Sequence, residues 1–384
     1  MTSFFAYDEI TWPEVALLPR NTPLVIPLGA GYDQLQLAAA LGAPPRVGLL
    51  PALPFGWHGS ALSVPDAVLG ALLRNLLDSL RDDGFTQVFA LTPEGLQLEL
   101  ELEHARIAQP VAARLQPARQ QLPPAAAAGS VILFPIGHTE QHGHHLPLST
   151  DNIIIDHISR AAAALLPQLA YSMPLMPYGV STHRSSFAGT LNSGGRAFED
   201  FWLAVVDALV ARGFDRIYLM SGHGGNCSFL TTVVKYAGER HRRIFCATAY
   251  LHTAGPAGAA AVKAHRVSAV GGMGHAGELE TSMILALRPD LTHMQRVVDE
   301  TDFVATASYY MDWAEGGALV ANPPWDDDTA TGSYGAGSVA TAAHGHIWLA
   351  AAAAEKAEHV REIHEQQRRR EQRREAGYGL WGRT

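Results

Sequence analysis

The sequence predicts an α/β protein with a mainly parallel sheet flanked by helices, preceded by a smaller, degenerate α/β half-domain. Three observations support this fold class. Short apolar runs alternate with alanine-rich helical patterns through residues 127–290, and the first third of the chain repeats part of that order. With 384 residues, the chain is long enough for two compact cores. Because such alternation favours crossover connections, we expect the strands to run parallel.

The expected strands of the second unit are apolar, partly β-branched runs that mostly end in proline or glycine. They are VILFPIG (131–137), SMPLMPYG (172–179), RIYLMSG (216–222) and RIFCATAYL (243–251). The expected helices between them are IDHISRAAAALLPQL (155–169), AFEDFWLAVVDALVARG (197–213) and LTTVVKYAGERH (230–241). A sheet of this kind places its site beyond the carboxyl ends of the strands, so residues that follow these runs are candidate site residues.

Metal-capable side chains follow the first of these strands in the stretch GHTEQHGHHLPLSTD. Glu140 and His142 are two residues apart, which on an extended backbone points both side chains to the same side. Asp151 starts a helical pattern after a loop that contains Gly143 and Pro147, so its carboxylate can turn back toward the pair. Carboxylate and imidazole groups are ligands for divalent ions such as zinc, manganese or iron.

Two later loops deliver further candidate ligands. His223 follows a strand-like run in SGHGGN, and His275 and Glu280 lie in GHAGELETS. A lone histidine in a glycine-rich loop is more often a hydrogen-bonding loop residue than a ligand. The recurrence of His or Glu beside glycine in three strand-end loops nevertheless predicts a dinuclear metal centre. His183, in STHRSSFAGT, and His145 are candidate substrate-binding residues, with a hydrogen-bonding loop role as the alternative for His183.

These motifs, in the same order and at similar spacing, resemble the creatininase family of metal-dependent amidohydrolases. The resemblance runs from about residue 127 to about residue 365 and includes YGVSTHRSSFAGTLNSGG, GHAGELETSMILALRPDL and the late stretch ATGSYGAGSVATAAHGH. It implies a creatininase-like fold and two divalent ions, with zinc as the first choice and manganese or iron as alternatives. Relatives form hexamers built from dimers, so a homo-oligomer is expected.

The resemblance also assigns the ligands of the two ions. One ion is held by Glu140, Asp151 and His223, and the other by His142, the bridging Asp151 and Glu280. Creatininase proper carries a Glu two residues after the His of the third motif, where this chain has Gly225. Glu280 is the residue that would complete the site here. His138 stands where relatives usually carry a small residue.

His275 resembles the catalytic histidine of the family. Two ions bridged by a carboxylate can hold a hydroxide at neutral pH, because a bound divalent ion lowers the pKa of water from about 15.7 to about 7. That hydroxide would attack a carbonyl, and an acid must then protonate the departing nitrogen. With an ordinary pKa of about 6.5, His275 suits this proton transfer. The alternative is a residue that caps or packs at the start of the helix formed by AGELETSMILAL.

Residues 11–95 are interpreted as a degenerate repeat of the first half of the catalytic unit. TPLVIPLGAGYDQ aligns with SVILFPIGHTEQ, LPALPFGWHG with MPLMPYGVSTH, and DSLRDDGFTQVFALTPEG with DALVARGFDRIYLMSGHGG. The alternative is that any strand–loop–helix protein shows similarities of this kind between its segments without a duplication. In this alignment the three ligand positions are occupied by Tyr32, Gln34 and Glu94, so no metal site is expected in this half.

Three segments are expected from this organisation. Residues 1–120 form a non-catalytic, creatininase-like half-domain, residues 127–365 the catalytic domain, and residues 366–384 a basic helical tail. A proline- and alanine-rich stretch, LEHARIAQPVAARLQPARQQLPPAAAAG, is predicted to link the two halves. The arginine-rich tail is read as a solvated helix end, with an RNA or partner contact as the alternative.

Composition excludes several classes of protein. A net charge of −9 gives no general attraction to nucleic acid or anionic membranes. The start, MTSFFAYDEITWPEV, lacks a positive n-region and a long apolar h-region, so no export signal is expected. With only Cys227 and Cys246, a disulfide framework is excluded and a cytoplasmic location is expected.

The predicted function is a metal-dependent amidohydrolase that cleaves a non-peptide C–N bond of a small molecule, such as a cyclic amide or a formamide. Creatinine itself is not expected, because the aromatic residues that cover substrate in creatininase proper are not evident near GGMGHAGE or in AYLHTAG. One alternative is a creatininase-like peptidase that trims a modified peptide in a biosynthetic pathway. An alternative of a different class is a non-catalytic metal-binding scaffold or regulatory subunit.

Overall fold

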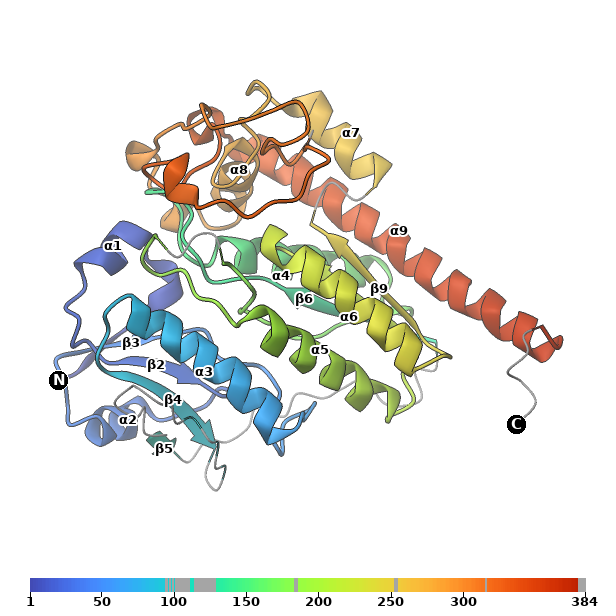
Figure 1. The fold of residues 1–384 in the computed structure, drawn as a ribbon, viewed down its shortest axis with the longest axis horizontal. Coiled ribbons are helices and arrows are strands. Elements are labelled where there is room, and N and C mark those ends of the chain that lie inside the picture. The colour runs from blue at the N-terminus through green and yellow to red at the C-terminus, as the bar shows by residue number, and fades with distance from the viewer. Residues whose placement is uncertain are drawn as a thin grey trace.

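The computed structural model describes residues 1–93, 96, 98, 100, 111–113, 129–182, 186–251, 255–314 and 316–378, arranged as two parallel α/β units (Figure 1). The sheet of the first unit has the strand order β1-β3-β2-β4-β5. Its strands are β1 (Ser3–Ala6), β2 (Leu24–Pro27), β3 (Arg46–Leu49), β4 (Val88–Pro93) and β5 (Val111–Ala113). Every neighbouring pair in this sheet is parallel, as predicted.

The sheet of the second unit has the order β7-β6-β8-β9, and it is also parallel throughout. Its strands are β6 (Val131–Ile136), β7 (Ala170–Ser172), β8 (Arg216–Ser221) and β9 (Phe245–Tyr250). Every residue of β6 and β8 is buried. Strands covered on both faces read as continuous apolar runs, which is why these two were visible in the sequence.

Helices connect the strands in both units. The first unit contains α1 (Trp12–Leu17), α2 (Gln34–Ala40) and α3 (Asp66–Asp82). The second contains α4 (Thr150–Leu165), α5 (Gly195–Val210), α6 (Cys227–Arg240), α7 (Pro256–His265), α8 (Glu278–Leu287) and α9 (Ala342–Glu375). Short 3-10 turns occur at Tyr7–Glu9, Gly224–Asn226, Pro289–Leu291, Met294–Arg296, Trp325–Asp327 and Gly337–Val339. None of the helices in the described ranges is long and apolar enough to cross a membrane.

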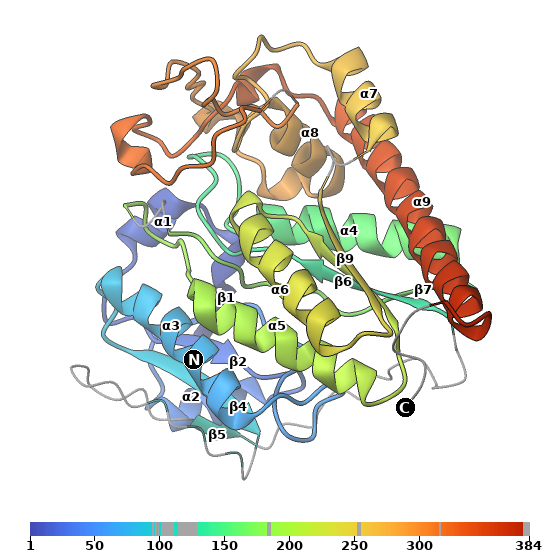
Figure 2. The same cartoon turned by 45° about the vertical axis from the view of Figure 1, so that its right-hand side comes forward.

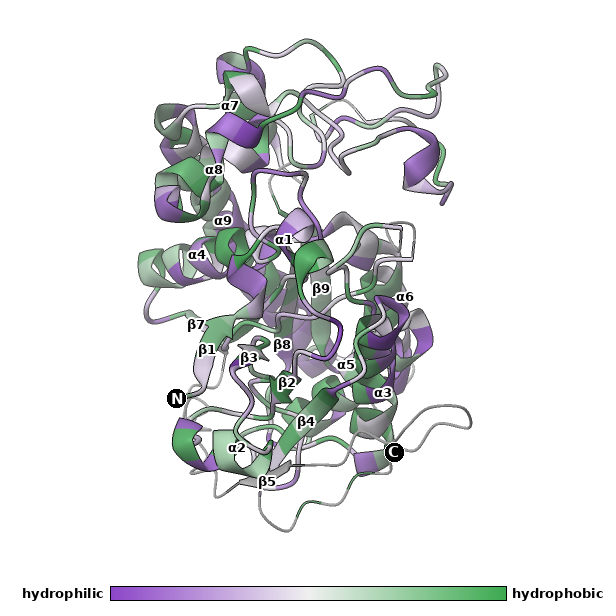
Figure 3. Ribbon diagram, turned by 90° about the vertical axis from the view of Figure 1, so that its left-hand side faces the viewer, coloured by the Kyte–Doolittle hydropathy of each residue, from purple (hydrophilic) through white to green (hydrophobic). Residues whose placement is uncertain are grey.

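The second sheet is covered on both faces. Alternate residues of β6 point to opposite sides: Ile132 and Phe134 join the core shared with α5 and α6, whereas Val131 and Leu133 join the core shared with α4, α8 and α9. Figure 2 shows α9 descending along the right-hand side of the molecule, against the end of α4. In Figure 3, β4 and β9 carry mainly hydrophobic colours, as expected for strands between helical layers.

The two units share one hydrophobic core. Helix α3 of the first unit packs against α5 of the second. Phe55 of the first unit lies 5.8 Å from Phe134, 6.1 Å from Phe201 and 6.2 Å from Trp202, measured between ring centroids. All four rings are fully buried. The first unit is therefore packed into the second rather than attached beside it.

The topology supports the proposed internal repeat. The strands β3-β2-β4-β5 of the first sheet have the same spatial and sequential order as β7-β6-β8-β9 of the second. Strand β5 lies inside the stretch predicted as a linker, and the rest of that stretch up to residue 128 lies outside the described residues. The basic tail is helical to Glu375, as the last turns of α9 rather than a separate segment. The duplication itself stays a prediction.

Candidate metal centre

The candidate site lies at the carboxyl ends of β6 and β8, where the strand order reverses. The connection that leaves β6 leads to β7 on one side, and the one that leaves β8 leads to β9 on the other. Such a switch point opens a crevice at the strand ends, the usual ligand site of an open parallel sheet. Glu140 follows β6 and His223 follows β8, and the Oε1 atom of Glu140 lies 3.0 Å from the Nδ1 atom of His223.

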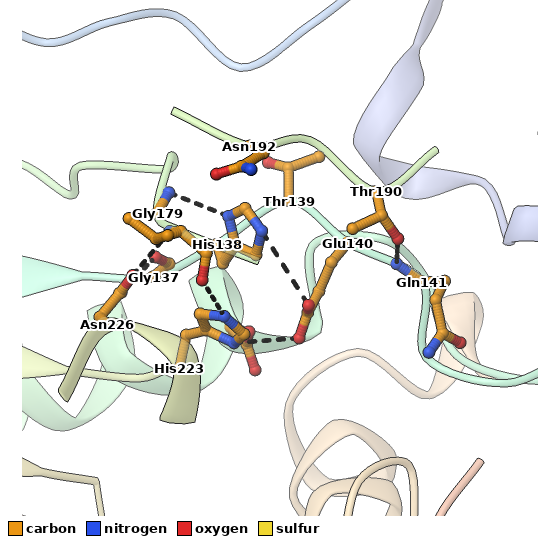
Figure 4. A network of polar contacts seen from close by, with 12 residues as sticks. Gly137, His138, Thr139, Glu140, Gln141, Gly179, Thr190, Asn192, His223 and Asn226 are labelled. Atoms are coloured by element: carbon orange, nitrogen blue, oxygen red, sulfur yellow. Dashed lines mark hydrogen bonds and ion pairs between the residues drawn. The ribbon is translucent and has the colours of Figure 1, made fainter. Parts of the chain in front are cut away.

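His223 is held in one tautomer by a backbone carbonyl. Its Nε2 atom lies 2.9 Å from the oxygen of Val180, which only accepts hydrogen bonds, so Nε2 carries the hydrogen. In the neutral ring the lone pair is then on Nδ1. That atom faces Oε1 of Glu140 and Oδ2 of Asp151, the latter at 3.2 Å. Figure 4 shows His223 turned toward Glu140 in this way.

A backbone carbonyl of its own loop also sets the tautomer of His142. Its Nδ1 atom lies 3.1 Å from the backbone oxygen of Glu140 and donates to it. The Nε2 atom of the neutral ring therefore presents its lone pair to Oδ1 of Asp151 at 3.2 Å and to Oε2 of Glu280 at 3.8 Å. The two oxygens of Asp151 thus face two different imidazoles.

His275 also points its lone-pair nitrogen inward. Its Nε2 atom lies 2.7 Å from the backbone oxygen of Gln141 and donates to it. Its Nδ1 atom lies 3.8 Å from Oε1 of Glu140 and 3.9 Å from Oε2 of Glu280. The ring lies against His142, tilted by 37° with 4.0 Å between centroids, and is met edge-on by Trp325 at 4.9 Å.

Glu280 reaches the centre because of a tight turn before α8. Ala276 has a φ of 53°, a left-handed conformation that residues other than glycine rarely adopt. Its N–H donates to Oε2 of Glu280 at 2.7 Å, which fixes the carboxylate beside His275. Strain of this kind is common at functional sites.

Gly225 cannot be replaced here by the glutamate of creatininase proper without rearrangement. A Cβ atom at this position would come within 2.3 Å of the Val180 oxygen and 2.4 Å of the His223 Nε2 atom. The hydrogen bond that sets the His223 tautomer therefore occupies the space that a side chain would need. Glu280 supplies a carboxylate beside His142 instead.

The donor set fits divalent ions. Two groups of buried residues, Glu140 with His142 and His275, and His142 with Asp151 and Glu280, each place their ligand atoms within 4.8 Å of one another. Burial opposes ionisation of Asp151, but His142 and His223 together hold the pKa of its carboxyl below the usual range. Imidazole lone pairs and ionised carboxylates that converge in this way match the nitrogen and oxygen ligands of zinc, manganese or iron.

Of the two predicted substrate-binding residues, only His145 is among the described residues. His183 lies outside the described residues. His145 is buried, and its Nε2 atom lies 2.9 Å from the hydroxyl oxygen of Thr281, which itself donates to the Ala276 carbonyl. Burial, reinforced by His142, lowers the pKa of His145 to about 4, so the ring is neutral. The first-half equivalents Tyr32 and Gln34 lie after β2, and Glu94 lies outside the described residues.

A cavity of about 620 Å³ borders the centre. Val180, Gly224 and Gly225 form one wall, next to His223, and Trp325 lies between the cavity and His275. Much of the remaining wall comes from the segment 309–325, which contributes Tyr309, Tyr310, Met311, Trp313, Leu319 and Val320. The sequence did not identify this wall, because the segment carries no recognisable strand or helix pattern.

Gln141 was not among the site residues predicted from the sequence. Besides its carbonyl contact with His275, its side-chain Nε2 donates to the Gly332 oxygen at 2.9 Å, and its Oε1 accepts from the Gly143 N–H at 2.9 Å. A Cβ atom on Gly332 would lie 2.1 Å from that Oε1 atom. The late stretch ATGSYGAGS contains Gly332 and was the available signal for this contact.

Comparisons with known proteins identify the family of the chain. The family described as creatinine amidohydrolase matches residues 118–360. The mycofactocin precursor peptide peptidase of Mycobacterium ulcerans (strain Agy99) is 34% identical over 173 residues, which cover 43% of this chain and 62% of that protein. Creatinine amidohydrolase of Pseudomonas putida is 28% identical over 190 residues, covering 45% of this chain and 70% of that protein. The chain therefore spans less than two thirds of the mycobacterial peptidase.

Solved structures show the same fold. A creatininase mutant matches with a TM-score of 0.53 and 24% identity, covering 62% of this chain and 93% of that one. A structure named "Creatininase Mn" matches with a TM-score of 0.52 and 24% identity, covering 62% and 92%. Because the family match spans more than half of the chain, the chain belongs to the creatininase family.

Proposed function

We propose that this chain is a metal-dependent amidohydrolase that cleaves a non-peptide C–N bond, as in a cyclic amide or a formamide. The observation that carries the proposal is the convergence of imidazole and carboxylate ligand atoms at the end of the second sheet. His142 and His223 both direct lone pairs toward Asp151, at 3.2 Å each. The ring tautomers that achieve this are set by backbone carbonyls.

In this proposal two divalent ions occupy the centre. Glu140, Asp151 and His223 would hold one, and His142, Asp151 and Glu280 the other. When bound, such ions lower the pKa of water and polarise a carbonyl oxygen, which is the chemistry that amide hydrolysis requires. A zinc–zinc form and a manganese form are both named among the solved creatininases.

The protein groups have separate tasks in the reaction. His275 keeps its Nε2 hydrogen on the Gln141 carbonyl, so Nδ1 is the atom that gains and releases a proton. That atom faces the centre beside Glu140 and Glu280. It is therefore placed to give a proton to the departing nitrogen, which cannot leave as an anion.

The neighbouring cavity indicates the size and polarity of the substrate that the site could hold. Its volume of about 620 Å³ falls within the range of sites that bind whole small-molecule ligands, roughly 300–1,000 Å³. Tyr309, Tyr310 and Trp313 give it a largely aromatic wall. A substrate with an apolar or aromatic portion beyond the reacting amide would bury that portion here.

This cavity favours a second candidate function, hydrolysis of an amide in a modified peptide. A peptide end with a large side chain would occupy more of the aromatic wall than a small ring amide. The peptidase of Mycobacterium ulcerans acts, by its name, on a precursor peptide. The alternative of a non-catalytic scaffold requires an incomplete ligand set, whereas all five proposed ligands lie together in the structure.

A substrate panel tests the proposal. Purified protein loaded with zinc or manganese is incubated with lactams, cyclic ureas, formamides and short peptides that end in aromatic residues, and the release of amine is measured. Turnover that is abolished by chelation and restored by metal is expected. Metal-loaded protein with two bound ions and no turnover on any member of the panel would favour the scaffold. Turnover confined to the peptides would select the second candidate.

A further inference from the structure

We propose that His138 is a positioning residue of the metal centre, whose Nε2–H group holds the Oε2 atom of Glu140 so that only Oε1 is offered to an ion. This inference rests on the proposed metal centre. Figure 4 shows His138 between Gly179 and Glu140, above His223.

The backbone of Gly179 fixes the tautomer of His138. The Gly179 N–H donates to the Nδ1 atom of His138 at 2.9 Å. Because Nδ1 accepts this bond, the hydrogen of the neutral ring must be on Nε2. That nitrogen lies 3.9 Å from Oε2 of Glu140, and both side chains are fully buried.

Asn226 holds the segment that sets this arrangement. Its Oδ1 accepts from the Val180 N–H at 2.9 Å, and its Nδ2 donates to the Gly137 oxygen at 3.2 Å. A Cβ atom on Gly179 would lie 2.3 Å from the same Oδ1 atom, so the backbone and this amide fit closely. Residues 179–180 therefore orient two imidazoles at once, that of His138 through an N–H and that of His223 through a carbonyl.

The same tautomer argues against His138 as a ligand. A ring nitrogen of His138, a Glu140 oxygen and a His223 nitrogen lie within 4.8 Å of one another, close enough for an ion by distance alone. A ring nitrogen that carries a hydrogen has no lone pair to offer, however. His138 instead directs its N–H toward the second oxygen of Glu140.

The contact has a consequence for coordination. A separation of 3.9 Å exceeds a direct hydrogen bond and is closed by a shift of roughly 1 Å or bridged by one water. The ring cannot swing away easily, because it lies against His223 with centroids 4.5 Å apart. With Oε2 engaged by His138, Glu140 would offer only Oε1 to an ion, which would leave room there for water or substrate.

Two substitutions separate the roles of the two ring nitrogens. His138→Asn keeps an acceptor near the Gly179 N–H but is too short to reach Glu140. His138→Gln places an amide N–H near the position of Nε2. Loss of an outer partner of a metal ligand typically lowers metal affinity by about 10- to 100-fold. We expect His138→Asn to weaken one of the two ions by this factor and His138→Gln to stay within a few-fold of wild type.

The measurement is a chelator competition with zinc or manganese alone, which reports both dissociation constants without substrate, together with the melting temperature of the metal-free protein. His359→Gln is the matched control: it removes a partly buried imidazole on α9 that is hydrogen-bonded to Tyr218, and both ions should bind as in wild type. A loss of one affinity in His138→Asn, its rescue in His138→Gln and an unchanged metal-free melting temperature would support the role.

Two results would overturn it. If His138→Asn binds both ions as tightly as wild type, the contact with Glu140 has no effect on the centre. If both ions weaken equally and the metal-free protein melts earlier, His138 serves packing alone. Wild-type protein that binds no ion at all would refute the metal centre itself, and this role with it, which distinguishes the two failures.

Discussion

The carboxylate of Asp151 faces the imidazole of His223 across 3.2 Å, and its other oxygen lies 3.2 Å from the Nε2 atom of His142. The two imidazoles come from loops that follow different strands, β8 and β6. Asp151 sits in the first turn of α4, between them. One carboxylate therefore contacts both imidazoles, and its role as a bridging ligand stays a prediction.

Asp151→Ala should lose nearly all bound metal and all turnover. The substitution removes an oxygen from each proposed ion position and leaves the imidazoles without their shared partner. Metal analysis of the purified variant checks this expectation. Two equivalents of metal per chain in Asp151→Ala would remove the bridging assignment.

His275→Ala should retain both metals and lower turnover by about 10²- to 10⁴-fold, the usual scale for proton transfer by a positioned side chain. The reason is that His275 faces the centre through Nδ1 at 3.8–3.9 Å from the carboxylates without being among the five proposed ligands. Metal content and turnover are measured on the same sample. Loss of one ion would instead make His275 a ligand, and unchanged turnover would assign the proton transfer to another group.

The first unit should support the fold without performing chemistry. Phe55→Ala removes a ring that packs against Phe134, Phe201 and Trp202, so we expect a loss of about 3–5 kcal/mol in the free energy of unfolding. Deletion of residues 1–120 should give insoluble or differently assembled protein, because α3 and the shared core cover α5. Chemical denaturation and size-exclusion chromatography provide the measurements.

Glu94→Gln is the control for this prediction, because the predicted repeat aligns this position with His223, and the substitution should leave metal content and turnover intact. A truncated protein that remains soluble, with unchanged assembly and full activity, would contradict the structural role. A metal bound at Tyr32 or Glu94 would contradict the absence of chemistry in the first unit.

Asp83 should make stability depend on pH. Burial raises the pKa of its carboxyl to about 6, against the opposing effect of the Gly189 N–H that donates to it at 2.7 Å. A raised pKa means that the folded state favours the protonated carboxyl. The contribution of Asp83 to the free energy of unfolding is complete below the pKa of the carboxyl in the unfolded chain, about 3.9. It is lost as the pH rises through the folded-state pKa of about 6.

Asp83→Asn keeps an acceptor for Gly189 and removes the ionisation. We therefore expect the variant to be more stable than wild type at pH 7, by about 1–2 kcal/mol after allowance for partial exposure, and close to wild type at pH 4. Melting temperatures of both proteins across this range measure the difference. A difference that does not change with pH would contradict the assigned shift.

The sequence determined the class of fold and the residue types of the centre. Parallel strands that are covered on both faces are apolar along most of their length, so VILFPIG and RIYLMSG were visible as strands, and both were confirmed as β6 and β8. Parallel strands bring their carboxyl ends to one edge, so the residues that follow them, Glu140 and His223, were candidate neighbours. These are local patterns that a single chain segment carries by itself.

Only the tertiary structure decided which atoms meet. The nitrogen that each histidine turns inward depends on a carbonyl or N–H from another segment, as with Val180 for His223 and Gly179 for His138. The aromatic wall formed by residues 309–325 and the burial of Phe55 against the second unit likewise have no local signature. The physical reason is that hydrogen-bond partners and packing neighbours are set by distances between residues far apart in the chain, whereas periodicity reports only the immediate surroundings of each segment.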